Sequence, residues 1–385
     1  MKITLSTTCL RWARERASLS VSDIASKMHV SEDKVQQWEE CGTLTLAQAD
    51  KLAHVTHTPI GYLFLPEPPV EQLPVTDFRT VGTQSINKIS PELIDTMNDA
   101  LRRQDWYRDY AESNGAHPFA YIGSLQVSGD IVKAVAHIRG VVDWDEEIRS
   151  QSATWEKALA QQIEAIEEAG ILVMRNGVVG NNTSRPLEVS EFRGFALSDP
   201  YAPLIFINNK DAKSAQMFTL AHELVHLFIG VSGVSNLNQT YAPDDQTEQF
   251  CNKVAAELLV PLNDLKRQWN NMSASKDVMT RLVKHFKVSE LVILRRLQDA
   301  DILTTNQFQM RYTDALAQLF TGKKVSSGGG DFYRTLRTRL GRRFASAVAE
   351  SVLEGTTLYR DAYSLLGVSN ADAVRKLARE VGVAA

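Results

Sequence analysis

The chain has 385 residues, more than one ordinary hydrophobic core accommodates, and this length predicts two to four domains. It is 44% hydrophobic and 23% charged, and its formal net charge of −4 argues against the overall basic character of many nucleic-acid-binding proteins. Three widely spaced cysteines make a disulfide framework unexpected, and there is no apolar run of the kind found in a signal peptide or a membrane span. We therefore expect a cytoplasmic, multidomain protein that contacts no membrane.

Residues 1–65 predict a compact domain of five short helices. Ser20 and Ser31 stand where helix N-caps belong. The prolines at 66–69 interrupt the helical pattern and begin a linker that we place at 66–89. The expected helices are Thr7–Arg16, Ser20–His29, Ser31–Glu39, Leu46–His54 and a last turn at Ile60–Phe64.

Residues 90–321 predict the largest domain, which we expect to be α+β and predominantly helical with a small antiparallel sheet. A helix from Ser90 toward Tyr110 and helices near 129–139 and 153–169 precede the strands. One further helix begins near Ala212, and another covers about Gln246–Leu259. A helix–turn–helix-like pair at 276–303 is expected to pack in the same core. The strand-like runs are Ile171–Arg175, Val189–Leu197 and Leu204–Ile207.

The last part of the chain predicts a flexible linker at 322–331 and a helical C-terminal domain at 332–385. The stretch 332–345 carries five arginines and no acidic residue, so it predicts a basic helix face. That face is either simply solvated or a contact for phosphate or an acidic partner. Its apolar side would consist of Phe332, Leu336, Leu340 and Phe344.

His222 and His226 are four residues apart in a predicted helix, so both imidazoles face one side and can bind a single metal ion. Glu223, next to the first histidine, can take a proton from a metal-bound water. A catalytic zinc needs a third protein ligand and an open position. We favour Glu248 because it opens the next helix, with Asn252 one turn later as a supporting partner. The alternatives are Asp244, Asp245, Glu257 and His285.

Residues 170–262 resemble the ImmA/IrrE metallopeptidases in three segments: FINN at 206–209, FTLAHELVHLFIG at 218–230 and EQFCNKVAAELLVP at 248–261. The resemblance implies that His222, His226 and Glu248 hold Zn²⁺ and that Glu223 is the base of a gluzincin-like peptide hydrolysis. Cys251 stands where the family often has alanine, and Met217 where it often has arginine; neither removes a ligand. An extended substrate could pair with the edge of Val189–Leu197 or Leu204–Ile207. Tyr201 and Tyr241 are weak candidates for oxyanion stabilisation.

Residues 20–40 have the layout of a helix-turn-helix, and residues 8–65 resemble the XRE (Cro/repressor-like) family. The resemblance implies that the helix from Ser31 enters the major groove of DNA. Residues 1–70 nevertheless hold seven Lys/Arg against eight Asp/Glu, which is no basic footprint and leaves a helical interaction domain as the alternative. The expected DNA-contacting residues are Ser31, Glu32, Lys34, Gln36 and Gln37, with Gln37 able to read adenine and Glu32 or Asp33 able to accept from cytosine.

The leading hypothesis is a DNA-binding regulator fused to a zinc-dependent endopeptidase. It would bind an operator through residues 1–65, form a homodimer, and cleave a regulatory protein such as a repressor, an antitoxin or a toxin partner. The alternative is a non-proteolytic transcription factor or antitoxin in which the zinc site is structural or sensory. The first hypothesis requires Glu223, whereas the second tolerates its replacement by glutamine.

Overall fold

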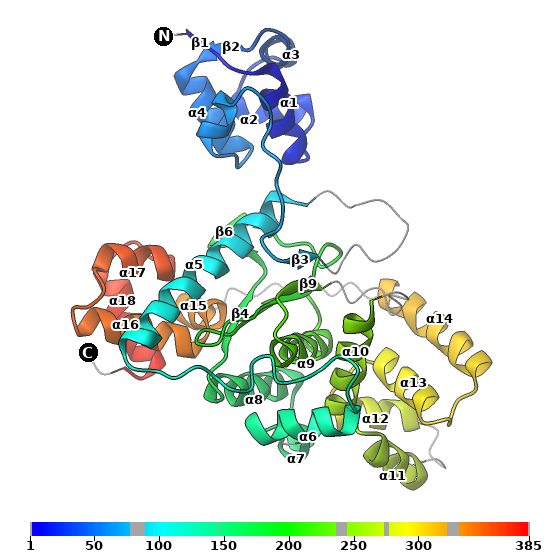
Figure 1. The fold of residues 1–385 in the computed structure, drawn as a ribbon. Coiled ribbons are helices and arrows are strands. Elements are labelled where there is room, and N and C mark those ends of the chain that lie inside the picture. Colours follow the sequence, from blue (N-terminus) through cyan, green and yellow to red (C-terminus); the bar gives the residue numbers. More distant parts are fainter. Residues whose placement is uncertain are drawn as a thin grey trace. The chain divides into compact units, whose positions relative to one another are not determined.

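The structure is a computed structural model that describes residues 2–77, 89–144, 146–235, 245–272, 277–321 and 331–383. It divides into two compact units (Figure 1). The first contains the described residues 2–74 and 89–95, and the second contains the other described residues. The chain is mostly helical with small sheets, as expected for an α+β protein.

Within residues 2–74 the expected five helices are four α-helices and one 3-10 turn. Ser20 forms a capping box with Asp23, and the Ser31 hydroxyl accepts from the Lys34 backbone N–H, so both predicted N-caps are confirmed. The sequence did not predict that β1 (Lys2–Thr4) pairs antiparallel with β2 (Thr43–Thr45). The helices are α1 (Thr7–Arg16), α2 (Val21–Met28), α3 (Glu32–Cys41), α4 (Leu46–Val55) and η1 (Ile60–Phe64).

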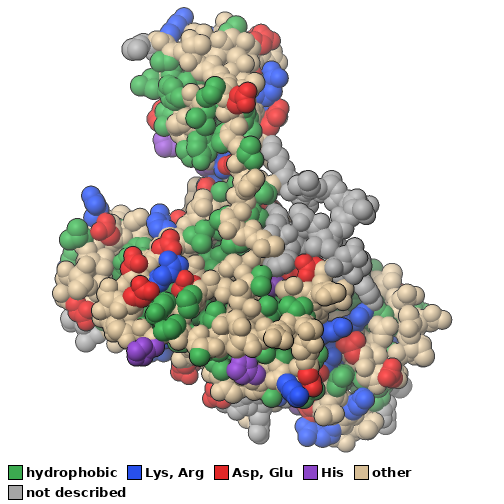
Figure 2. Space-filling view, in the orientation of Figure 1, with side chains coloured by type: hydrophobic (Ala, Val, Ile, Leu, Met, Phe, Trp, Pro, Cys, Tyr) green, Lys and Arg blue, Asp and Glu red, His purple; other side chains and the backbone are tan. Residues whose placement is uncertain are grey.

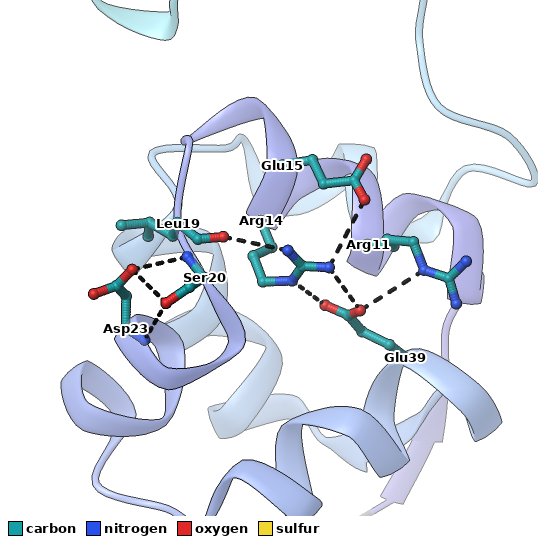
Figure 3. Close-up of polar contacts among 7 residues, drawn as sticks. All are labelled: Arg11, Arg14, Glu15, Leu19, Ser20, Asp23 and Glu39. Atoms are coloured by element: carbon teal, nitrogen blue, oxygen red, sulfur yellow. Dashed lines mark hydrogen bonds and ion pairs between the residues drawn. The ribbon is translucent and has the colours of Figure 1, made fainter.

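Charged side chains tie the helices of the first unit together over an apolar core. Arg14 of α1 donates from Nε and Nη2 to the two carboxylate oxygens of Glu39 at the end of α3, at 2.6 and 3.0 Å (Figure 3). Arg16 is only 3% exposed; it pairs with Glu71 and donates to the His57 carbonyl. The core beneath includes the buried side chains Ile24, Met28, Val35, Trp38 and Leu52.

The second unit is built on a sheet whose described strands number five, in the order β3-β9-β7-β8-β4. The prediction of an antiparallel sheet is wrong, because β3 runs parallel to β9 and β4 runs parallel to β8. Only β7 is antiparallel to both its neighbours. The strands are β3 (Thr76–Asp77), β4 (Leu172–Asn176), β7 (Gly194–Leu197), β8 (Leu204–Asn208) and β9 (Gly233–Ser235), and β5 (Val178–Val179) and β6 (Asn182–Pro186) form a separate hairpin.

Two of these strands differ from their predicted extent. The run Val189–Leu197 is a strand only from Gly194, because residues 189–193 form a turn in which the Glu191 and Phe192 N–H groups donate to the Glu188 carbonyl. The strand β3 lies within the predicted linker 66–89, of which residues 78–88 are outside the described residues.

Helices precede and follow the strands of this sheet, and α6 and α8 to α14 share one large core with it. Before the sheet come α5 (Pro91–Ser113), α6 (Ile131–Val141), α7 (Glu146–Gln151) and α8 (Trp155–Glu168). After β8 come α9 (Lys213–Ile229), α10 (Gln246–Leu259), α11 (Leu262–Met272), α12 (Val278–Phe286), α13 (Glu290–Asp299) and α14 (Thr305–Thr321). Leu282, Phe286 and Ile293 share the core of α9 and α10, so the helix pair within 276–303 packs inside this unit as expected.

The C-terminal segment forms α15 (Phe332–Leu340), α16 (Arg342–Leu353), α17 (Tyr359–Leu366) and α18 (Ala371–Val381). The prediction of one basic helix face is wrong, because Gly341, at φ +78°, separates α15 from α16. Arg343 is also not a solvated side chain: its Nε donates to the Tyr107 hydroxyl and its Nη1 to the Glu167 carbonyl. Residues 322–330 of the predicted linker 322–331 lie outside the described residues.

Acidic and basic side chains are interspersed on the face of the molecule drawn in Figure 2. Among the described residues, no helix combines the length and the apolar character needed to cross a membrane.

Candidate metal centre

The C-terminal half of α9, residues 220–228, carries three ionisable residues in an otherwise apolar, fully buried environment. Leu220, Ala221, Leu224 and Val225 are 0% exposed, so this helix is apolar on nearly all sides, which is typical of a core helix. His222, Glu223 and His226 are also 0% exposed. Burial of three such groups side by side costs free energy unless a partner compensates them, so this helix has a role beyond packing.

The helix α10 brings a carboxylate to the two histidines. Asp245 caps it by accepting from the Thr247 and Glu248 backbone N–H groups, which fixes Glu248 in the first turn. Glu248 Oε2 lies 3.2 Å from His222 Nε2, and Glu248 Oε1 lies 3.0 Å from His226 Nε2. Its side chain is 7% exposed.

The three side chains converge on one point. The two Nε2 atoms of His222 and His226 are 3.0 Å apart, and each is within 3.2 Å of a Glu248 oxygen. Ligand atoms about 2.0–2.2 Å from a tetrahedral zinc are about 3.3 Å from one another, so the observed separations are close to those of a bound ion. His222, His226 and Glu248 form the group of possible metal ligands found among the described residues.

Asn252, one turn after Glu248, fixes the orientation of one imidazole. His222 Nδ1 lies 3.1 Å from Asn252 Oδ1. Because an amide oxygen only accepts, Nδ1 carries the proton and the lone pair of Nε2 faces Glu248 and His226. A partner on the far nitrogen is the usual support of a metal-binding histidine, so the predicted position of Asn252 fits that role.

The electrostatics of the group match a cation site. Burial alone would lower the pKa of His222, but the Glu248 carboxylate raises it above its ordinary value. Burial lowers the pKa of His226. Burial would raise the pKa of Glu248, but the two imidazoles hold it well below its usual range, so Glu248 is an ionised ligand. Burial raises the pKa of the Cys251 thiol well above its ordinary value, which keeps it out of competition for a metal.

Glu223 is the fourth ionisable group at the centre, and it is fully buried. Among the described residues, neither of its carboxylate oxygens has a hydrogen-bond partner of good geometry. Burial raises its pKa to about 8; His222 and, to a smaller extent, the Ser235 hydroxyl lower it, whereas the Glu248 carboxylate adds to the rise. A buried carboxyl with a raised pKa and no structural partner is typical of an acid–base group.

The other candidates for the third ligand lie elsewhere or are engaged. Asp245 is the cap of α10, Glu257 pairs with Arg296, and His285 lies 3.4 Å from Asp264. Asp244 is outside the described residues. The geometry therefore brings Glu248, and none of these three, to the histidines.

The strands predicted to offer an edge to a substrate are inner strands of the sheet that the described residues form. β7 pairs with β8 and β9, and β8 pairs with β7 and β4, so both are inner strands and that prediction is wrong. The metal centre lies near Gly194, at the beginning of β7. The other end of β7 is about 10 Å away along the strand, and Tyr201 comes after that end. Tyr241 lies outside the described residues.

The predicted DNA-contacting residues lie together on α3 and its N-cap. Ser31, Glu32, Lys34, Gln36 and Gln37 are all exposed, while Val35 and Trp38 on the opposite side are buried. The Lys34 ammonium donates to Gln37 Oε1 at 2.7 Å, so one face of α3 carries a polar pair between turns. Exposure is necessary for groove contacts, but it does not distinguish DNA from a protein partner.

Residues from the sheet also line the centre, and the sequence analysis missed them. Ser235 of β9 is 0% exposed, and its Oγ lies 3.4 Å from His222 Nε2. Gly194 of β7 is close enough to Glu223 that a Cβ there would lie 3.2 Å from Oε1. Neither residue has a sequence signal of its own, because strand pairing brings it to the histidines.

Comparison with known proteins gives two matches to family models. Residues 166–298 match the model described as the IrrE N-terminal-like domain, Peptidase_M78, and this segment contains β4, α9 and α10. Residues 340–380 match a domain of unknown function, DUF8813. No curated protein matches the chain. The first match indicates a metallopeptidase family for the segment that holds the candidate ligands.

Proposed function

We propose that the second unit is a zinc-dependent endopeptidase with His222, His226 and Glu248 as ligands and Glu223 as general base. The observation that carries the proposal is the unpartnered Glu223 carboxylate beside three convergent ligand atoms. The set of two imidazoles and one carboxylate suits zinc and leaves a fourth position open. The match to a peptidase family supports peptide hydrolysis as the reaction class.

The protein groups divide the work of such a reaction. A zinc ion bound here supplies Lewis acidity and lowers the pKa of its water. Glu223 accepts the proton of the attacking water and later passes it to the leaving amine, which requires the ionised carboxylate first. Asn252 holds the His222 ring, and the apolar residues of α9 keep bulk water from the proton transfer.

The decisive test replaces Glu223 with glutamine and leaves the ligands intact. The purified wild-type protein and the Glu223→Gln variant should each bind about one zinc, and His226→Ala should lose it. Proteomics of cells that express either form should show cleavage products with the wild type that are missing with Glu223→Gln. A zinc-free wild type with an intact fold would overturn the metal centre, and identical proteomes would overturn the peptidase.

A second candidate function, zinc sensing or structural zinc binding in a non-proteolytic regulator, is favoured by one observation. His222, Glu223 and His226 are all 0% exposed, which is more closed than an open catalytic site requires. In that case Glu223→Gln would leave the biological response unchanged, whereas His226→Ala would abolish it. The same pair of variants therefore separates the two functions.

We propose that the first unit directs the protein to its target, with DNA as the leading partner. The exposed polar face of α3 after the Ser31 cap supports this proposal, and the acidic Glu32, Asp33 and Glu40 on the same helix oppose it. Regulator proteins such as a repressor, an antitoxin or a toxin partner are the proposed substrates, and a homodimer is the proposed assembly. A gel shift on the gene's own promoter should show salt-dependent binding that Gln37→Ala weakens.

A further inference from the structure

We propose that Ser235 is a positioning residue whose hydroxyl donates to the Glu223 carboxylate and orients it toward the point where the ligand atoms of His222, His226 and Glu248 converge. This inference rests on the proposed peptidase function. It assigns a task to β9, which no sequence motif marks, and it makes the sheet part of the reaction site.

The sheet fixes the position of Ser235. It pairs with Gly194 in the β9–β7 register, and its carbonyl accepts from the Arg193 backbone N–H at 3.2 Å. The backbone of Ser235 is thus held by the sheet, and its buried side chain reaches to 3.4 Å from His222 Nε2. A hydroxyl fixed this way cannot turn to solvent.

The Glu223 carboxylate lies close to the same pair of strands. A Cβ on Gly194 would lie 3.2 Å from Glu223 Oε1 and 2.5 Å from the Thr219 methyl group. The carboxylate therefore lies against the pair formed by Gly194 and Ser235, and only glycine leaves room for it on β7. The strand pair β7–β9 covers the carboxylate, with the hydroxyl on the strand opposite the glycine.

The Ser235 hydroxyl has one proton to donate, and both His222 Nε2 and the Glu223 carboxylate can accept it. Asn252 holds the proton of His222 on Nδ1, so without a metal the His222 Nε2 lone pair is one acceptor for Ser235. A metal ion held by His222 and Glu248 would occupy that lone pair and the Glu248 oxygens. The Ser235 hydroxyl would then have the Glu223 carboxylate as its acceptor, because neither Glu223 oxygen is engaged by another described residue. Loading of the site would thus be coupled to the orientation of the base.

The test compares Ser235→Ala with Ser232→Ala in the zinc-loaded full chain. Ser232 is three residues upstream, and its hydroxyl accepts from the Ser198 backbone N–H at 2.7 Å, so it is a matched control with no contact to the site. The first readout is the hydrolysis of a synthetic peptide that spans a cleavage site identified in the proteomic experiment. We expect Ser235→Ala to lower kcat about tenfold at unchanged KM and unchanged zinc content, because partners that orient site groups contribute about 10–100-fold. Ser235→Thr, which keeps the hydroxyl, should recover most of the rate.

The second readout needs no substrate. Acetohydroxamate binds zinc as an anion and must transfer its proton to a nearby base, so its affinity reports on an oriented Glu223. Calorimetry should give an affinity about tenfold weaker in Ser235→Ala than in wild type, with Ser232→Ala unchanged. Equal hydroxamate affinities in wild type and Ser235→Ala would overturn the role of Ser235. A wild type that binds hydroxamate but cleaves no protein would instead overturn the proposed peptidase, and the affinities would still decide the role of Ser235.

Discussion

Buried charge is handled in opposite ways in the first unit and at the metal centre. In the first unit Arg16 is buried but meets Glu71 and the His57 carbonyl, and Arg14 meets both oxygens of Glu39. At the metal centre both Glu223 oxygens lack a hydrogen bond among the described residues. The satisfied groups stabilise a fold, whereas the unsatisfied group costs stability and is retained for chemistry. The comparison therefore distinguishes charged groups whose partners are in place from a carboxylate that has none among the described residues.

The largest effect is expected where a satisfied buried charge loses its partner. Arg16→Ala removes a guanidinium that is 3% exposed, and with it the ion pair to Glu71 and the hydrogen bond to the His57 carbonyl. We expect the first unit to lose about 3 kcal/mol of free energy of unfolding. Hydrogen exchange of residues 2–74 measures this loss. Arg11→Ala is the control, because Arg11 is 57% exposed and 3.7 Å from Glu39; an equal loss of protection in both variants would contradict the prediction.

The same substitution should have opposite signs in the two regions. Glu39→Leu removes the carboxylate that accepts two hydrogen bonds from Arg14, which then keeps Glu15 at 3.8 Å and the Leu19 carbonyl, and should destabilise the first unit by about 1–3 kcal/mol. Glu223→Leu removes an unpartnered carboxyl from an apolar helix and should stabilise the metal-free second unit by a similar amount. Urea unfolding after removal of metal measures both changes. If Glu223→Leu destabilised the protein, Glu223 would have a structural partner and the comparison would fail.

A smaller effect is expected from the residue that supports a ligand. Asn252→Ala removes the acceptor of the His222 Nδ1 proton and should weaken zinc binding about 10–100-fold. Competition with a zinc chelator gives the affinity. Lys253→Ala, an exposed change on the same helix, should leave it unaltered. Equal affinities in the three proteins would show that the contact does not orient the ring.

The smallest effect concerns a polar group that is only partly compensated. Glu167 accepts from the Arg343 backbone N–H at 3.0 Å, yet burial raises its pKa to about 7. The folded protein thus holds this proton more tightly than the unfolded chain, so stability falls as pH rises from about 4.5 to about 7. Glu167→Gln should remove about 1 kcal/mol of that pH dependence in thermal unfolding at pH 5 and pH 8. The exposed Glu168→Gln should retain it, and identical slopes for all three proteins would refute the assignment.

Local signals predicted the helices well because their ends are chemically marked. Ser20, Ser31 and Ser289 act as N-caps, and the helix predicted at about Gln246–Leu259 lies between the Asp245 cap and Pro261. The spacing of two histidines is a local signal as well, since it needs only one helix.

Pairing between distant segments was not predictable in the same way. The strands β1, β2 and β3 have two or three residues, too few to show an alternating pattern. The parallel pairing of β4 with β8 depends on which strands become neighbours in the folded chain. The sequence of neither strand specifies its neighbour. Ser235 and Gly194 reach the site through such pairing, so they became visible only in the folded chain.

The contact between Gly341 and the sheet has a consequence for how the protein behaves at high concentration. β4 is an outer strand of the described sheet, and α15 packs beside it, with Gly341 so close that a Cβ would lie 2.5 Å from the Val173 carbonyl oxygen. An outer strand left uncovered is a template on which other chains add strands and aggregate. The C-terminal helices thus cover the outer edge of Leu172–Asn176. A truncated chain that ends before these helices is expected to self-associate through that edge.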